Sequence, residues 1–179
     1  MPEGAADDEA AIVAAVEAGT DGIVVPPPLV EETGEPPREI VRALHAQIAL
    51  MAVPEKIKLA LRGNKDARQI LIRDNNKVIR RLVLQNPRVT DAEIVAITHN
   101  RTADDELLRV ISDRREWIRN YQVRLGLATN PKTPITVALK QLLLLGERDM
   151  RALAKSRNVP QSVAVQARRI LAARNPGGS

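Results

Sequence analysis

The stretch RRLVLQNPRVTDAEI, residues 80–94, carries the pattern that decides the fold: an aliphatic segment of helical character stops at an Asn-Pro pair, and a new helix begins shortly after it. Pro87 cannot continue a helix, because its ring fixes φ and removes an amide donor, while Asn86 tolerates the irregular backbone of a turn. Thr90 and Glu93 form a capping-box pattern, in which each side chain satisfies the other residue's backbone amide. The stretch therefore predicts two helices joined by a short turn.

The same pattern recurs along the chain. Asn-Pro pairs stand at 86–87, 130–131 and 175–176, at spacings of 44 and 45 residues. An arginine lies six residues before each asparagine, at Arg80, Arg124 and Arg169. A fixed period of this length indicates stacked repeats of two or three helices each.

The rest of the sequence fits an all-α protein, because apolar residues recur at the helical period and no segment alternates like a strand. Pro54 suits the first turn of a helix, Asn64 and Thr102 suit N-caps, and Gly63 suits a helix end. The predicted helices cover residues 8–18, 39–51, 54–62, 65–72, 77–85, 91–98, 103–111, 115–128, 135–145, 147–155 and 160–173.

The amino-acid composition limits the kinds of core, chemistry and location that the protein can have. The 179 residues are 44% hydrophobic but include no Phe, one Trp and one Tyr, so the core must consist of aliphatic side chains. Cysteine is absent, which excludes disulfides, thiolate nucleophiles and cysteine-ligated metals, and we expect a reducing cytoplasm. Residues 1–10 are acidic and do not resemble a signal peptide, and no apolar run approaches the length of a membrane span.

The charge is divided unevenly along the chain. Residues 1–52 contain two basic and ten acidic side chains, whereas the other 127 residues contain 25 basic and 12 acidic ones. The segment 19–37 holds Pro26-Pro27-Pro28 and Pro36-Pro37 and several glutamates, which favour a solvated polyproline linker. We therefore predict two parts: an acidic short helix with a disordered linker over residues 1–37, and a basic helical-repeat domain over residues 38–176.

The runs 80–94 and 124–139, with Asn-Pro-Arg-Val-Thr and Asn-Pro-Lys-Thr-Pro before an apolar helix, resemble the leucine-rich repeat variant group of helical solenoids, and more loosely HEAT and armadillo repeats. The resemblance covers roughly residues 53–176. The spacing here is about twice the usual short unit of that group, and no cysteine cluster precedes the repeats. The resemblance implies a right-handed α-α superhelix that presents a binding surface and carries no chemistry, in a protein of bacterial origin.

Stacked repeats bring equivalent positions into register, so Arg80, Arg124 and Arg169 are expected to form a ladder that suits phosphates or carboxylates. The alternative is that each arginine pairs with an acidic residue nearby, such as Asp74, Asp113 or Glu116. The candidate partner-binding surface also includes basic and aromatic side chains elsewhere in the repeats: Arg81, Arg115, Arg119, Trp117 and Tyr121.

Trp117 and Tyr121 are four residues apart, which places them on one face of the predicted helix near Arg124. They are candidates either for interface anchors or for ordinary core residues. No catalytic, metal-binding or cofactor-binding residues are predicted, because His45 and His99 are isolated and no phosphate loop or nucleophile elbow is present.

The sequence thus favours a non-enzymatic cytoplasmic adaptor or scaffold that binds an acidic protein partner. Sequence-independent binding of duplex DNA by the same basic surface is the alternative. The acidic segment 1–37 is a further candidate ligand of the basic part of its own chain, where it would weaken the binding of other anions.

Overall fold

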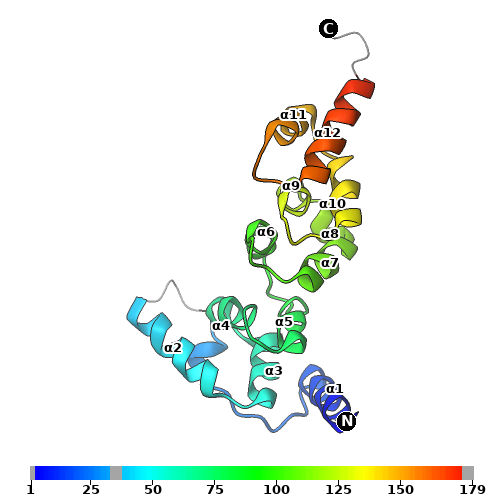
Figure 1. The fold of residues 1–179 in the computed structure, drawn as a ribbon. Helices are drawn as coiled ribbons and strands as arrows, with labels where there is room; N and C mark the ends of the chain where they lie inside the picture. Colours follow the sequence, from blue (N-terminus) through cyan, green and yellow to red (C-terminus); the bar gives the residue numbers. More distant parts are fainter. Residues whose placement is uncertain (1–2, 33–37, 175–179) are drawn as a thin grey trace. The chain divides into compact units, whose positions relative to one another are not determined.

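The computed structural model describes residues 3–32 and 38–174, and the prediction of an all-α fold is confirmed within that part of the chain. The described residues form twelve α-helices and one short 3-10 helix, with no strand among them (Figure 1). None of these helices combines the length and the apolar character needed to cross a bilayer. The chain divides into two compact units, Met1–Val89 (unit 1) and Thr90–Ser179 (unit 2).

Unit 1 holds the helices that precede the first Asn-Pro pair. Their buried residues, among them Val16, Leu29, Ile48, Ile57 and Leu71, form one hydrophobic core. The helices of unit 1 are α1 (Glu3–Ala18), η1 (Pro27–Leu29), α2 (Arg38–Leu50), α3 (Val53–Arg62), α4 (Lys65–Leu71) and α5 (Lys77–Val83).

Unit 2 holds the remaining helices. Leu142, Met150 and Val163, from three successive helices, are fully buried in a core at its C-terminal end. The helices of unit 2 are α6 (Asp91–His99), α7 (Asp105–Asp113), α8 (Arg115–Ile118), α9 (Tyr121–Thr129), α10 (Ile135–Leu142), α11 (Glu147–Lys155) and α12 (Gln161–Arg174).

The repeat seen in the sequence corresponds to a set of three main helices. In each set the first helix packs against the third: α3 against α5, α6 against α9, and α10 against α12. The two sets of unit 2 are joined by packing of α9 against α10. Asn76 and Asn120 cap α5 and α9, which are 44 residues apart, so the period applies to helix starts as well as to helix ends.

The asparagine of each described Asn-Pro pair has a structural role beyond the turn. Asn86 and Asn130 are buried, and the Nδ2 of each donates to two carbonyls near the end of an earlier helix. The carbonyl acceptors belong to Ala60 and Gly63 for Asn86, and to Thr98 and Asn100 for Asn130, at 2.8–3.1 Å. These bonds satisfy carbonyls that a helix C-terminus leaves without partners. The third pair, 175–176, lies outside the described residues.

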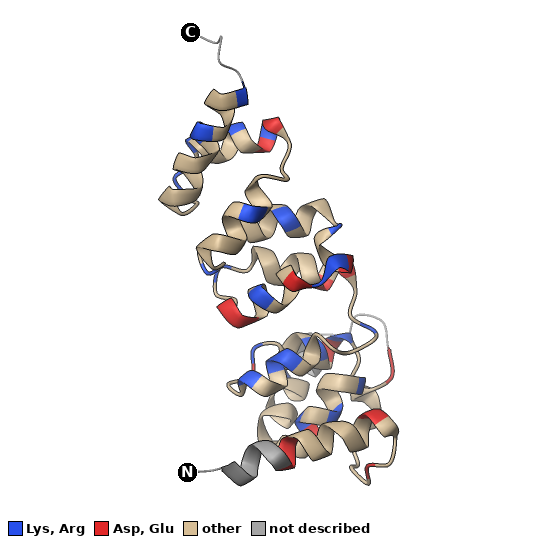
Figure 2. Ribbon diagram, turned by 90° about the vertical axis from the view of Figure 1, so that its right-hand side faces the viewer, with Lys and Arg blue, Asp and Glu red and all other residues tan. Residues whose placement is uncertain are grey.

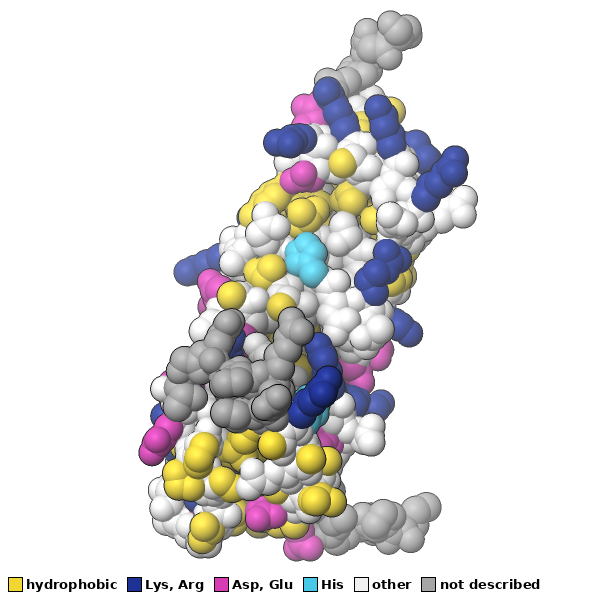
Figure 3. All heavy atoms as spheres, turned by 90° about the vertical axis from the view of Figure 1, so that its left-hand side faces the viewer, with side chains coloured by type: hydrophobic (Ala, Val, Ile, Leu, Met, Phe, Trp, Pro, Cys, Tyr) yellow, Lys and Arg dark blue, Asp and Glu magenta, His cyan; other side chains and the backbone are white. Residues whose placement is uncertain are grey.

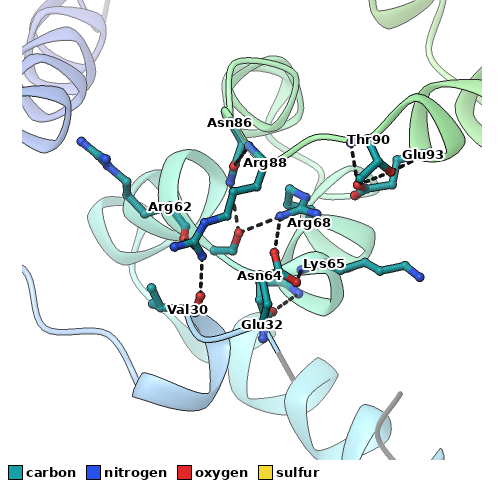
Figure 4. Close-up of polar contacts among 12 residues, drawn as sticks. Val30, Glu32, Arg62, Asn64, Lys65, Arg68, Asn86, Arg88, Thr90 and Glu93 are labelled. Carbon is teal, nitrogen blue, oxygen red and sulfur yellow. Dashed lines mark hydrogen bonds and ion pairs between the residues drawn. The ribbon is translucent and has the colours of Figure 1, made fainter. Parts of the chain in front are cut away.

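Asn64 makes equivalent contacts, although no proline follows it. Its Nδ2 donates to the carbonyls of Pro28 and Glu31, both at 2.8 Å, and its Oδ1 caps α4 by accepting from Ala67. Figure 4 shows this asparagine between the N-terminal segment and α4. Asn64 therefore fixes residues 28–31 against the first helical set.

The prediction of a disordered linker is wrong for residues 19–32. Leu29 is fully buried in the core of unit 1, and Asp21 forms an ion pair with Lys58 at 2.6 Å. Lys58 also donates to the carbonyl of Ile23, which orders the backbone beside the ion pair. Residues 33–37 lie outside the described range. The predicted boundary near residue 37 also differs from the observed division, because residues 38–89 belong to the same unit as the N-terminal segment.

The predicted helix 115–128 is interrupted. Helix α8 ends at Ile118, and Asn120 caps α9 by accepting from the amide of Gln122. An N-cap residue has extended rather than helical backbone, so Trp117 and Tyr121 lie on different helices. The start of α7 was also misplaced, because its cap is Asp104 rather than Thr102.

Candidate functional site: the basic surface of unit 2

The positive charge of the chain is concentrated in unit 2. Unit 1 contains 12 basic and 13 acidic residues and unit 2 contains 15 basic and nine acidic ones, so their formal charges are −1 and +6. The division into an acidic N-terminal segment and a basic remainder, predicted from the sequence, is therefore replaced by a nearly neutral unit and a basic one.

Basic residues of unit 1 are largely engaged in contacts within that unit. Besides Lys58, Lys56 pairs with Asp74 at 3.0 Å and Arg68 pairs with Glu32 at 3.1 Å. Arg68 is 2% exposed, and it also donates to the carbonyl of Gly63. These side chains hold the first helical set together and are not available to a partner.

Two further arginines of unit 1 fasten the N-terminal segment through its backbone. Arg62 donates to the carbonyls of Val16 and Glu17 at the end of α1, and Arg88 donates to the carbonyl of Val30 at 2.6 Å (Figure 4). Arg62 and Arg88 thus dock the N-terminal segment against the helices of unit 1.

Three arginines were predicted to form a ladder, and each has a different environment. Arg80 donates to the carbonyl of Asp74 at 2.7 Å, at the turn before its own helix. The guanidinium of Arg124 lies over the ring of Tyr121, 5.5 Å from its centre. Arg169 is exposed on α12. The contact of Arg80 agrees with the structural alternative considered above, and it is made to the backbone oxygen of Asp74.

Arg81, Arg115 and Arg119 are exposed, the first on α5 and the other two at the ends of α8. Arg115 and Arg119 make no ion pair or side-chain hydrogen bond with any described residue, whereas the neighbouring Arg114 does. The Arg114 guanidinium lies 3.6 Å from the Glu116 carboxylate and over the Trp117 ring, 5.0 Å from its centre. Arg115 and Arg119 therefore remain candidates for partner binding.

The two aromatic residues belong mainly to the interior of unit 2. Trp117 is 8% exposed, which agrees with the core interpretation. The Tyr121 hydroxyl donates to the Asp149 carboxylate and accepts from the amide of Gly146 at 3.1 Å. The hydrogen bond to Asp149 raises the pKa of Tyr121 above its ordinary value of 10.0, and burial acts in the same direction. Tyr121 thus ties α9 to the start of α11.

A larger group of basic residues in unit 2 includes three candidates predicted from the sequence, Arg115, Arg119 and Arg169. Its eleven members are exposed, and their side chains have no ion pair or hydrogen bond within residues 3–32 and 38–174. We refer to them as the exposed basic set: Arg101, Arg109, Arg115, Arg119, Lys132, Lys140, Arg148, Lys155, Arg157, Arg169 and Arg174. The set can therefore attract an acidic partner without breaking a described contact of the fold.

The acidic residues of unit 2 are mostly placed where they stabilise helices. Seven of the nine occupy the cap or first turn of α6, α7 or α11, at the positive end of the helix dipole. No acidic residue follows Asp149 in the sequence. Figure 2 shows basic but no acidic positions in the described part of the last helix, and Figure 3 shows basic side chains gathered in its upper part. This segregation was visible in the sequence as an acid-free C-terminal stretch.

Two groups of large apolar side chains are exposed. On unit 1, Val24 and Leu50 are 84% and 88% exposed and line a shallow groove together with Met51 and Glu55. On unit 2, Leu143 and Leu144 are 54% and 53% exposed at the end of α10. The second group belongs to the unit that carries the exposed basic set.

Among the described residues no three His, Asp or Glu side chains converge as metal ligands. The ring of His99 contacts the carbonyl of Gln122 at 3.2 Å, and His45 is exposed on α2. The surface of unit 2 combines exposed basic side chains with exposed apolar side chains at the end of α10.

Comparisons with known proteins give no relative for this chain: no protein family, no curated protein and no solved structure matches it.

Proposed function

We propose that the chain is a non-catalytic adaptor or scaffold whose basic surface on unit 2 binds an acidic protein partner. The observation that carries the proposal is the exposed basic set, eleven side chains that have no described partner in the fold. Most acidic side chains of the same unit lie at helix N-termini, where they interact with the helix ends. They therefore do not neutralise the positive potential of the exposed basic set.

The recurring set of three helices supports a solenoid as the scaffold. Equivalent packing of first and third helices, and buried asparagines that bond to earlier helix ends, are contacts between neighbouring elements of the kind that builds repeat proteins. We propose a right-handed α-α superhelix, as the leucine-rich repeat variant and armadillo resemblance implies. Because the scaffold has no cysteine, it does not depend on disulfides and is compatible with a reducing cytoplasm, which we propose as its location.

A protein partner is favoured over nucleic acid by the exposed leucines in the turn after α10, because a phosphate backbone offers no apolar surface for them. Duplex DNA is the second candidate, and the acid-free helix α12 with Arg169 and Arg174 favours it.

Fluorescence anisotropy with labelled polyglutamate and labelled duplex DNA tests the proposal. We expect polyglutamate to bind at low salt and to dissociate as salt rises. The informative variant replaces Lys132, Lys140 and Arg148 by Gln, and its matched control replaces the exposed unit 1 residues Lys65, Arg73 and Lys77 by Gln.

The unit 2 variant should weaken polyglutamate binding roughly tenfold, at about 0.5 kcal/mol for each exposed ionic contact, and the control should change it by less than about twofold. No binding of either polymer at low salt would refute the proposal. Binding of DNA alone would replace the acidic protein by nucleic acid as the partner, and equal effects of the two variants would remove unit 2 as the site.

A further inference from the structure

The outer side of α10 combines exposed apolar residues at helical spacing. Ile135 is 44% exposed and Leu143, eight residues on, is 54% exposed, with the partly buried Leu139 midway between them. Residues four apart on a helix lie one above the other, so these three side chains form one stripe. Leu144 stands beside it, four residues after Lys140. We call Ile135, Leu139, Leu143, Leu144 and Lys140 the α10 face.

Most of the α10 face lies outside the core of unit 2, because Ile135, Leu143 and Leu144 are exposed and only Leu139 packs against the core. Helix α10 already buries Ala138 and Leu142 on its inner side, where it packs against α9 and α12, and Leu145 closes the core after the turn. Leu143 and Leu144 lie in the turn that follows α10, and more than half of each side chain is exposed. Adjacent exposed leucines of this kind are typical of an interaction site.

All charged residues in the stretch of sequence that contains α9 and α10 are basic. No acidic residue occurs from Trp117 to Gly146, which includes all of α9 and α10. Lys132 precedes α10, Lys140 lies within it and Arg148 follows it, all exposed. The nearest acidic residues in the next helix are engaged, since Glu147 pairs with Arg151 and Asp149 accepts from Tyr121.

We infer that the α10 face anchors a partner segment in which large apolar side chains are interspersed with carboxylates. Apolar side chains of that segment pack on Ile135, Leu143 and Leu144, and its carboxylates meet Lys140 and the flanking Lys132 and Arg148. The stripe from Ile135 to Leu143 is about 12 Å long at 1.5 Å per residue, which matches roughly two turns of a partner helix. This inference rests on the proposed function and specifies where and how the acidic partner binds.

Two short labelled peptides of equal charge test it: one contains glutamates and leucines, and the other has serine in place of each leucine. The test variant carries Leu143→Ser and Leu144→Ser. The matched control carries Val24→Ser and Leu50→Ser, which removes the exposed apolar pair of unit 1 instead. All four side chains are more than half exposed, so both variants should melt as the unmodified chain does in a circular dichroism scan.

We expect the Glu/Leu peptide to bind the unmodified chain at least about tenfold more tightly than the Glu/Ser peptide, because even partial burial of two leucines contributes that much. The Leu143/Leu144 variant should lose that advantage and the Val24/Leu50 variant should keep it. Equal binding of the two peptides, an unchanged Leu143/Leu144 variant, or the same loss in the unit 1 control would overturn the inference and leave the proposed function standing. Failure of both peptides to bind at low salt would refute the proposed function itself.

Discussion

Replacing Asn130 by Ala removes the buried side chain that joins α9 to the end of α6. Asn130 is 3% exposed, its Nδ2 donates to the carbonyls of Thr98 and Asn100, both at 2.8 Å, and its Oδ1 accepts from the amide of Lys132 at 2.9 Å. Alanine leaves all three backbone groups without these partners. The change therefore tests whether this asparagine, rather than the proline that follows it, holds α9 against the end of α6.

The three lost bonds do not carry equal weight. The carbonyl of Asn100 still accepts from the amide of Ala103, and Lys132 is exposed, so water can replace the lost acceptor at its amide. A buried polar group without a partner costs about 1–3 kcal/mol, and the exposed or shared bonds cost less, so we expect a loss of about 2–4 kcal/mol in the free energy of unfolding.

Urea denaturation followed by Trp117 fluorescence measures this loss, because the only tryptophan of the chain lies in the same unit as Asn130. The control is Asn158→Ala, which truncates an exposed asparagine of the same unit and should stay within about 0.5 kcal/mol of the unmodified chain. If Asn130→Ala were as stable as this control, the structural role given to the buried asparagines would be wrong.

Three further predictions concern other contacts of the fold. Gly126→Ala should destabilise unit 2 by about 1–3 kcal/mol in the same assay, because its new Cβ would lie 2.4 Å from the Oγ1 of Thr98, whereas Gly22→Ala, with open space around it, should not. Tyr121, the only tyrosine, should form phenolate with a midpoint above pH 10.0, and Asp149→Asn should lower that midpoint. The hydrogen bond stabilises the fold below the pKa of tyrosine in the unfolded chain, and this stabilisation is lost as pH rises through the raised pKa of the folded state. A midpoint at or below pH 10.0 would contradict the assignment. Deletion of residues 1–32 should unfold unit 1 rather than release its basic residues, because Val16 and Leu29 are buried in its core, and a truncated chain with unchanged helicity would refute this.

The helices and caps could be predicted from local sequence because the signals that set them are local. The capping box of Thr90 and Glu93 is confirmed by reciprocal hydrogen bonds, and Asn64 caps α4 as predicted. The break before Tyr121 was missed because apolar periodicity continues through it, although Asn120 was available as a cap signal.

The candidate site depended on contacts that local sequence does not reveal. Lys58 and Arg68 meet acidic partners 37 and 36 residues away, so their neutralisation could not be read from spacing. The N-terminal segment was interpreted as a linker from its prolines and glutamates, while Leu29 was the signal that it packs. By contrast, the absence of acidic residues from 117 to 146 and after Asp149 is a property of the sequence itself and indicated where the unpaired charge lies.

Hydrogen–deuterium exchange of the full chain, with and without saturating Glu/Leu peptide at low salt, tests whether an acidic partner binds at the α10 face. We expect slower exchange of backbone amides in α10 and the start of α11, around Lys140 and Arg148, with the amides of unit 1 unchanged. Slower exchange confined to unit 1, beside Val24 and Leu50, would contradict it.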